Sequence, residues 1–279
     1  MAGTLLHITL ADEALSGADL PGAIRRDIVG RMDDYRLGAV LFDLPHFENL
    51  LVNGLRLLLK QEIQFGVWGQ LFHLRSPTGL CRELVTEARD GAARAMALGA
   101  LTHLAIDTLF HREIEGRVMR IADGTRGLNA LHKRVEDQMD LHVHRHLLGH
   151  PGVGTPYARK MLDLRPAASW RERFSKAILA IHGSAPSGAT LSRWLRGLTL
   201  FGITQSYKNV PWIDDVPEDD PVLKRRAVEL AEQAVERSRE YLRIGLANME
   251  QTNDGTAPLT AIEENNLING GEAYPALKK

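Results

Sequence analysis

Cysteine is almost absent from this chain, because Cys81 is the only one among 279 residues. A single cysteine excludes both a disulfide framework and a cysteine-rich zinc site. Aromatic residues make up only 6% of the sequence, and the formal net charge is -1 at pH 7. Since nucleic-acid binding usually needs a basic surface with stacking aromatics, the composition indicates no clear nucleic-acid surface.

Long apolar runs are missing as well. No stretch approaches the length that a transmembrane helix needs, so we expect no transmembrane segment. The amino terminus lacks the basic start and apolar run of a secretion signal, which favours a cytoplasmic protein. With 44% hydrophobic and 25% charged residues, the composition is that of a globular protein. We predict one helical domain over residues 1–250 and a polar, loosely packed tail over residues 251–279.

Helical periodicity recurs along the chain, whereas alternating strand patterns and internal repeats are absent. A proline-free, alanine-rich run predicts one long, buried helix over residues 82–115. Gly99 within it would let a neighbouring helix approach closely, and we expect a second helix, over residues 128–148, to pack against it. An amphipathic helix is predicted from Pro221 to about residue 248. The fold class expected is all-α, in a single multi-helix domain.

Four shorter segments are less distinct. Residues 4–15 favour a short helix, although their apolar run also fits a strand. Asp19-Leu20-Pro21 is typical of a helix start and predicts a helix to about Tyr35. Residues 66–74 are rich in glycine and ambiguous, and residues 212–220 form a proline- and acid-rich loop.

Three side chains of metal-ligand type share one face of the long central helix. His103, Asp107 and His111 follow one another at intervals of four residues, so they stack along that face. Imidazole and carboxylate are ligands that zinc prefers. The alternative is two core histidines whose tautomers are fixed by the aspartate. We favour the metal site, because a carboxylate buried in so apolar a helix needs a counter-charge.

The second helix repeats this spacing with His132, Glu136 and Asp140. These side chains share a face in the same way, again with histidine before carboxylate. His142 and His146 are also four residues apart. They alternate with Val143 and Arg145, as in a partly solvated helix end, and are left out of the predicted site.

Three isolated residues upstream are weaker candidates. His7 lies among leucines and isoleucine, where a core histidine is the commoner explanation. Asp43 follows an apolar run two residues before a proline, which is typical of a helix end or a solvated turn. His73 lies between Phe72 and Leu74, and its core and ligand interpretations are equally open.

Taken in order, these motifs resemble those of the zinc-dependent phospholipase C family. The central pair is Gly99-x-x-x-His103-x-x-x-Asp107-x-x-x-His111 followed by His132-x-x-x-Glu136-x-x-x-Asp140. The early His7, the element from Leu37-Gly38-Ala39 to Asp43, and the isolated His73 resemble upstream elements of that family. The resemblance covers roughly the first half of the chain, and it implies an all-helical core shared with secreted zinc nucleases.

The resemblance also implies a set of zinc ligands. One Zn2+ would be surrounded by Asp43, His73, His103 and Asp107, and a second would be held by His111, His132 and Glu136. A third would be reached by His7 and the shared Asp107. Asp43 would in addition be the candidate general base of catalysis. Asp140 would hold an imidazole in its tautomer or remain a helix-face carboxylate.

The implied reaction is hydrolysis of a phosphodiester, with a phospholipid or a small phosphodiester as substrate. Divalent ions can activate a water and stabilise charge on the phosphate, so no serine or cysteine nucleophile is needed. The sequence contains no Gly-x-Ser-x-Gly motif and no His-Glu-x-x-His motif. Two alternatives stay open: a phosphohydrolase or nuclease acting on non-lipid substrates, and a non-catalytic scaffold stabilised by metal.

Overall fold

The computed structural model describes residues 3–59, 66–121, 128–207 and 221–251, and every regular element within these ranges is a helix. The predicted all-α fold is therefore confirmed, and the helices form a single domain around one core. In chain order they are α1 (Gly3–Gly17), α2 (Gly22–Val29), α3 (Met32–Ala39), the short 3-10 helix η1 (Leu44–Phe47), α4 (Leu50–Leu58), α5 (Val67–Leu74), α6 (Pro77–Thr86), α7 (Gly91–Ile121), α8 (Leu128–Leu148), α9 (Pro156–Leu162), α10 (Trp170–His182), α11 (Gly188–Ser206) and α12 (Pro221–Gln251).

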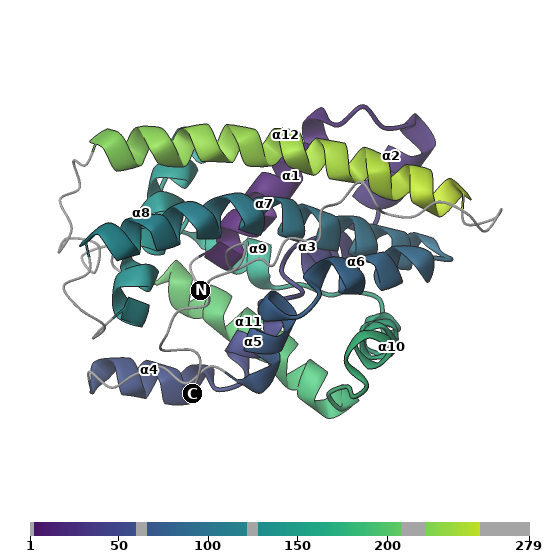
Figure 1. The fold of residues 1–279 in the computed structure, drawn as a ribbon, viewed down its shortest axis with the longest axis horizontal. Helices are drawn as coiled ribbons and strands as arrows, with labels where there is room; N and C mark the ends of the chain where they lie inside the picture. Colours follow the sequence, from purple (N-terminus) through teal and green to yellow (C-terminus); the bar gives the residue numbers. More distant parts are fainter. Residues whose placement is uncertain (1–2, 60–65, 122–127, 208–220, 252–279) are drawn as a thin grey trace.

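The long helix α7 lies at the centre of the molecule. In Figure 1, α12 runs beside it on one side, and α4, α5, α10 and α11 lie on the other. Helices α1, α3, α6, α8 and α12 all contact α7. Residues 95–107 are buried without interruption, because the sequence there is apolar or small on every face. The prediction that this helix is central and contacts the 128–148 helix is confirmed.

The boundaries of this central helix differ from the prediction. The run expected to form one helix over residues 82–115 is divided between the end of α6, at Thr86, and α7, which begins at Gly91 and continues to Ile121. Asp90 marks the division, since its Oδ1 accepts a hydrogen bond from the backbone N–H of Ala93 at 3.0 Å. A side-chain oxygen in this position satisfies a free N–H of the first turn and so favours a new helix start.

The helix expected from Pro21 to Tyr35 is likewise two helices, α2 and α3. At the end of α2, the N–H of Gly30 donates to the carbonyl oxygen of Arg26 at 2.9 Å, and α3 begins at Met32. Both ambiguous segments are helical. Residues 4–15 lie within α1, and residues 66–74 are covered almost entirely by α5.

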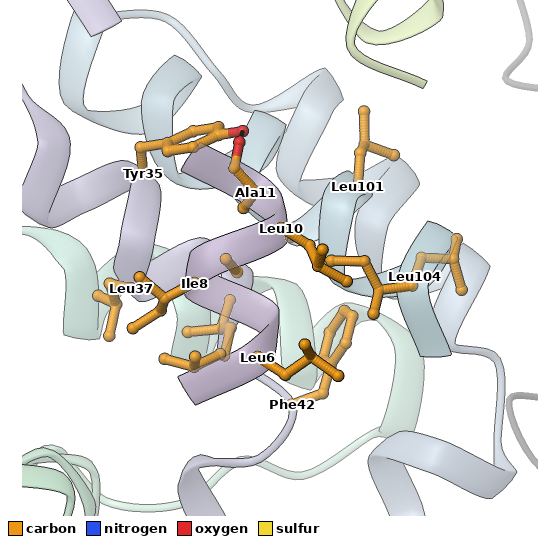
Figure 2. Packing of buried hydrophobic residues seen from close by; sticks show 14 of the residues in the cluster. Leu6, Ile8, Leu10, Ala11, Tyr35, Leu37, Phe42, Leu101 and Leu104 are labelled. Atoms are coloured by element: carbon orange, nitrogen blue, oxygen red, sulfur yellow. Dashed lines mark hydrogen bonds between the residues drawn. The ribbon is translucent and has the colours of Figure 1, made fainter. Parts of the chain in front are cut away.

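Helix α1 is buried in the core along most of its length. Figure 2 shows its side chains Leu6, Ile8 and Leu10 inside the apolar cluster, which also includes Leu104 of α7. At the far end of this contact, the Tyr35 hydroxyl donates to the carbonyl oxygen of Ala11 at 2.8 Å. Because burial of apolar surface favours this docking, α1 is held inside the protein and carries His7 with it.

Helices α3 and α7 cross with their backbones in contact. A Cβ atom at Gly99 would lie 1.9 Å from the carbonyl oxygen of Tyr35, and one at Gly38 would lie 2.0 Å from that of Met96. Only glycine fits at either position. The predicted close approach at Gly99 is therefore confirmed, with α3 as the partner at that point. The crossing places the end of α3, and the chain leading to Asp43, against the middle of α7.

The C-terminal helix α12 covers α7 from the other side. Its amphipathic character is confirmed, because one face is buried, and Tyr241 beside it is half-buried. The buried residues include Leu223, Ala227, Ala231, Ala234, Val235 and Leu242. The predicted loop at residues 212–220 and the predicted tail, beyond Gln251, lie outside the described residues. Within the described ranges, no helix has the length and apolar character that crossing a membrane requires.

Replacing Gly99 by alanine should destabilise the fold through the α3–α7 crossing. The added methyl group would meet a backbone oxygen, which can move only if the helices separate, and we expect a loss of about 1–3 kcal/mol in the free energy of unfolding. Gly116→Ala, on the same helix, is the matched control. Its Cβ would meet only the end of Arg120 at 3.6 Å. The free energy of unfolding of this variant should therefore rise by about 0.5–1 kcal/mol. Urea denaturation measures both, and equal stability of the two variants would contradict the crossing.

Candidate metal centre

The carboxylate of Asp107 lies among four imidazole rings. Its Oδ1 is 2.9 Å from Nε2 of His7 and 3.2 Å from Nε2 of His111. Its Oδ2 is 3.1 Å from Nε2 of His103 and 3.5 Å from Nε2 of His73. Asp107 is only 1% exposed. The structure therefore brings together five of the predicted site residues around one buried negative charge.

Three helices supply these five side chains. His103 and His111 lie one helical turn on either side of Asp107 on α7, as four-residue spacing requires. His7 comes from α1, and its ring stacks on that of His103 with centroids 4.1 Å apart. His73 comes from α5, with its ring edge-on to His103 at 5.9 Å. Two of the three helices thus lie far from α7 in the sequence.

Asp43 joins this arrangement next to His73. The Nε2 atom of His73 is 3.4 Å from Asp43 Oδ1, and Thr4 donates a hydrogen bond to the other carboxylate oxygen at 3.2 Å. His46, one turn further along in η1, lies beside the same histidine, with ring centroids 5.6 Å apart. Asp43, His46 and His73 could hold a metal ion, because their ligand atoms all lie within 4.8 Å of one another. His7, His103 and Asp107 form a second such group.

His46 is the member of these groups that sequence reasoning missed. The spacing Asp43-x-x-His46 was available as a signal, since residues three apart share a face in a helical turn. Room for the ring depends on Gly69 of α5, where a Cβ atom would lie 2.6 Å from His46 Cε1. That contact joins segments distant in the sequence, so no local pattern indicates it.

Backbone carbonyl groups orient two of the imidazoles. Nδ1 of His103 is 2.9 Å from the carbonyl oxygen of Ala39, and Nδ1 of His73 is 2.8 Å from that of Gly69. Since a carbonyl oxygen only accepts, these contacts assign the proton to Nδ1. The other ring nitrogen, Nε2, faces Asp107 in both residues. Metal-binding histidines are commonly fixed in this way.

The electrostatics keep the carboxylates ionised. Burial alone would raise the pKa of Asp107, but the surrounding His111, His103 and His7 hold it well below its ordinary value. Burial also opposes ionisation of Asp43, and the hydrogen bond with His73 and the nearby imidazoles more than reverse this, lowering its pKa. Both carboxylates are therefore charged at neutral pH and available to a cation.

The pKa values of the imidazoles are shifted in opposite directions. Burial lowers the pKa of His7, and repulsion from His103 lowers it further. Burial likewise lowers the pKa of His46, to about 3. At His111 burial acts in the same sense, but the attraction of Asp107 outweighs it and raises the pKa to about 9. At His103, too, burial is outweighed by Asp107, which raises the pKa. His7 and His46 are thus the neutral donors, which is the form that binds metal.

Several buried polar atoms of the site lack a hydrogen-bond partner within the described structure. They are Nδ1 of His7, Nε2 of His103, Oδ2 of Asp107 and Nδ1 of His111. His103 Nε2 and Asp107 Oδ2 are 3.1 Å apart, but they are not aligned as a hydrogen bond. Buried polar groups without partners are costly. A divalent cation between nitrogen and carboxylate donors would satisfy His103 Nε2 and Asp107 Oδ2, and this donor set fits zinc.

The remaining predicted ligands, His132 and Glu136, lie on α8 next to this centre. The rings of His111 and His132 are 5.6 Å apart between centroids, and Glu136 Oε2 is 4.0 Å from the ammonium of Lys133. A small cavity between α1, α7 and α8 is lined by Glu136, Asp107 and His111 among others. In the part of the chain that the structure describes, however, His111, His132 and Glu136 do not form a group as close as the two above.

The interpretation of the site rests on this geometry, because comparisons with known proteins found no match. No family model matches the chain, and no match is found among curated proteins or solved structures.

Replacing His103 by alanine should release metal and lower the melting temperature of protein purified with zinc. His103 is fully buried beside Asp107, and a metal bound only to the folded state stabilises it by mass action. His146→Ala is the control, since this histidine is exposed on α8. Elemental analysis and thermal unfolding check both variants. Equal metal content in His103→Ala and wild type would show that the group around Asp107 binds none.

His46→Ala should weaken zinc binding at least about tenfold. A loss of about this size is typical even when the residue removed only bonds to a metal ligand. Gly69→Ala should have the same effect without replacing any ligand residue, because the methyl group would displace the His46 ring. Competition with a coloured chelator measures the affinity. Unchanged affinity in both variants would remove His46 from the site.

Proposed function

We propose that this chain is a metal-dependent phosphodiester hydrolase, with a helical core and mechanism like those of the zinc-dependent phospholipase C family. The observation that carries the proposal is the pair of adjoining ligand groups. His73 joins them, because its Nε2 is 3.4 Å from Asp43 and 3.5 Å from Asp107. Neighbouring divalent ions are typical of enzymes that hydrolyse phosphate esters.

The ligand groups can be assigned on their distances. His7, His103 and Asp107 would hold one zinc ion, and Asp43, His46 and His73 a second. This assignment differs from the one that the family resemblance implies, in which Asp43, His73, His103 and Asp107 surround a single ion. In both, Asp107 is central. His111, His132 and Glu136 would hold a further ion in the proposed enzyme.

When bound, zinc supplies Lewis-acid chemistry: it acidifies water and stabilises negative charge on phosphate oxygens. The chain itself contributes oriented donors. Asp43 is held from both sides, by Thr4 at one oxygen and His73 at the other. Because its pKa lies below the ordinary value, the carboxylate is ionised at neutral pH and can accept a proton from the attacking water. Asp43 is therefore the proposed general base.

Partial exposure indicates the side from which substrate would enter. The side chains of His103 and Asp107 are almost completely covered, whereas those of Asp43, Glu136 and His111 are 13%, 12% and 19% exposed. A phosphodiester would approach over these three residues. A catalytic metal site must leave one position open, so this partly exposed edge is where that position would lie.

The deep burial of His103 and Asp107 also favours a second candidate function, a metal-stabilised scaffold without catalysis. In a structural site the protein fills every position around the metal. Such a protein would depend on metal for stability and would hydrolyse no phosphodiester.

An activity assay separates the two functions. Zinc-loaded wild type should hydrolyse bis-p-nitrophenyl phosphate, p-nitrophenylphosphorylcholine or a short-chain phospholipid, and a strong chelator should abolish the reaction. Asp107→Asn keeps the shape of the side chain but removes the charge, so activity should fall to background. The control His146→Ala should retain the wild-type rate.

The three substrates distinguish the possible functions. Hydrolysis of the simple diester but not the choline ester would support the phosphodiesterase and set aside the phospholipid. If wild type binds zinc and is as inert as Asp107→Asn on all three substrates, the scaffold replaces the enzyme.

A further inference from the structure

The cavity between α1, α7 and α8 has a carboxylate-rich wall that the two close ligand groups do not use. Its polar lining consists of His7 from α1, Asp107 and His111 from α7, and Glu136 and Asp140 from α8. The two carboxylates on α8 are one helical turn apart, so they lie on the same face of the helix. Both therefore border the same small space.

Asp140 is a buried carboxylate of this lining with an unpaired oxygen. It is only 6% exposed, and its Oδ1 has no hydrogen-bond partner within the described structure. Its backbone oxygen faces Nδ1 of His144 at 2.8 Å, which stabilises the helix but leaves the carboxylate unaffected. A buried carboxylate oxygen that points into a cavity without a partner is costly unless a cation or a proton satisfies it.

Gly3 leaves room over the neighbouring carboxylate. A Cβ atom at this position would lie 2.8 Å from Oε1 of Glu136. Glycine therefore lets the first turn of α1 close the cavity without pressing on that oxygen. Space beside Glu136 and Asp140 is preserved by the absence of a side chain.

Charged groups of both signs surround the two carboxylates. The ammonium of Lys133 is 4.0 Å from Glu136 and is also bonded to Asp137. Burial opposes ionisation of Glu136, but the amino-terminal ammonium and Lys133 lower its pKa. His7 and His111 both direct Nε2 at Asp107. Burial raises the pKa of Asp140 well above its ordinary value, and repulsion from Glu136 and Asp137 adds to this. A bound divalent cation would favour the ionised form of Asp140.

We propose that Asp140 and Glu136 bind a further divalent cation in this cavity. Carboxylate oxygens suit hard ions such as Mg2+, Ca2+ and Mn2+, in contrast to the imidazole-rich groups that suit zinc. Asp140 is a ligand in this assignment. The inference rests on the proposed function in that Glu136 is also a member of the proposed zinc set, but it requires no phosphodiester chemistry.

Manganese is the probe for this site, because electron paramagnetic resonance distinguishes bound from free Mn2+. Zinc-loaded full-length protein is titrated with MnCl2. We expect wild type to bind Mn2+ in addition to its zinc, and Asp140→Asn to bind Mn2+ at least tenfold more weakly with its zinc content unchanged. Asp137→Asn is the matched control. It removes the same charge from the same turn of α8 but does not line the cavity, and should change the affinity less than twofold.

Thermal unfolding is a second measurement. It distinguishes metal binding by Asp140 from a role in packing alone. Without metal, Asp140→Asn should melt at or above the wild-type temperature, because it removes a buried carboxyl group whose Oδ1 has no hydrogen-bond partner within the described structure. Adding Mn2+ should raise the melting temperature of the wild type more than that of the variant. Gly3→Ala provides a second route, since the methyl group would press on Glu136 and should also weaken Mn2+ binding.

The outcomes separate this inference from the proposed function. Equal Mn2+ affinity in wild type and Asp140→Asn, or no Mn2+ bound by zinc-loaded wild type, would overturn the cation site even if phosphodiesters are hydrolysed. Loss of Mn2+ binding in Asp140→Asn supports the site even if every phosphodiester assay is negative. If Asp140→Asn fails to fold, the Mn2+ affinity of Gly3→Ala decides in the same way.

Discussion

A single buried negative charge sets the arrangement of this protein. Asp107 lies in the middle of the central helix, and a carboxylate in that position is tolerated only when positive or polar groups surround it. Side chains from α1 and α5 meet it, together with two from α7 itself. Asp43, which follows α3, is reached through His73. The apolar core and the polar centre therefore share the same helices, and neither is complete without the other.

Residues close together in the sequence were the predictable part of this centre. Helical spacing alone places His103 and His111 on either side of Asp107, and the structure has them there. The close approach at Gly99 was predictable for a similar reason, since a glycine inside an otherwise good helix indicates a packing need. The all-α class followed from periodicity repeated over most of the chain.

Features that depend on contacts between distant segments were not predictable in the same way. His46 enters the site only because Gly69, on another helix, leaves space for its ring. The division between α6 and α7 falls at Asp90, whose Oδ1 accepts a hydrogen bond from the Ala93 N–H within an otherwise continuous helical pattern. Order along the chain indicated His7 and His73 as candidates, and both lie beside Asp107 in the structure, but spacing gave no reason for their meeting. That reason is the burial of α1 and the docking of α5.

The stacking of His7 on His103 has a consequence for how the chain folds. Contacts within α7 are local and can form as soon as that helix does, whereas His7 must return across nearly the whole first half of the described chain. Closing so long a loop costs entropy that only the packed core repays. The ring pair is therefore a late native contact, and the environment of His7 is a marker of completed folding. Any spectroscopic signal from that ring would report the final docking of the amino-terminal helix.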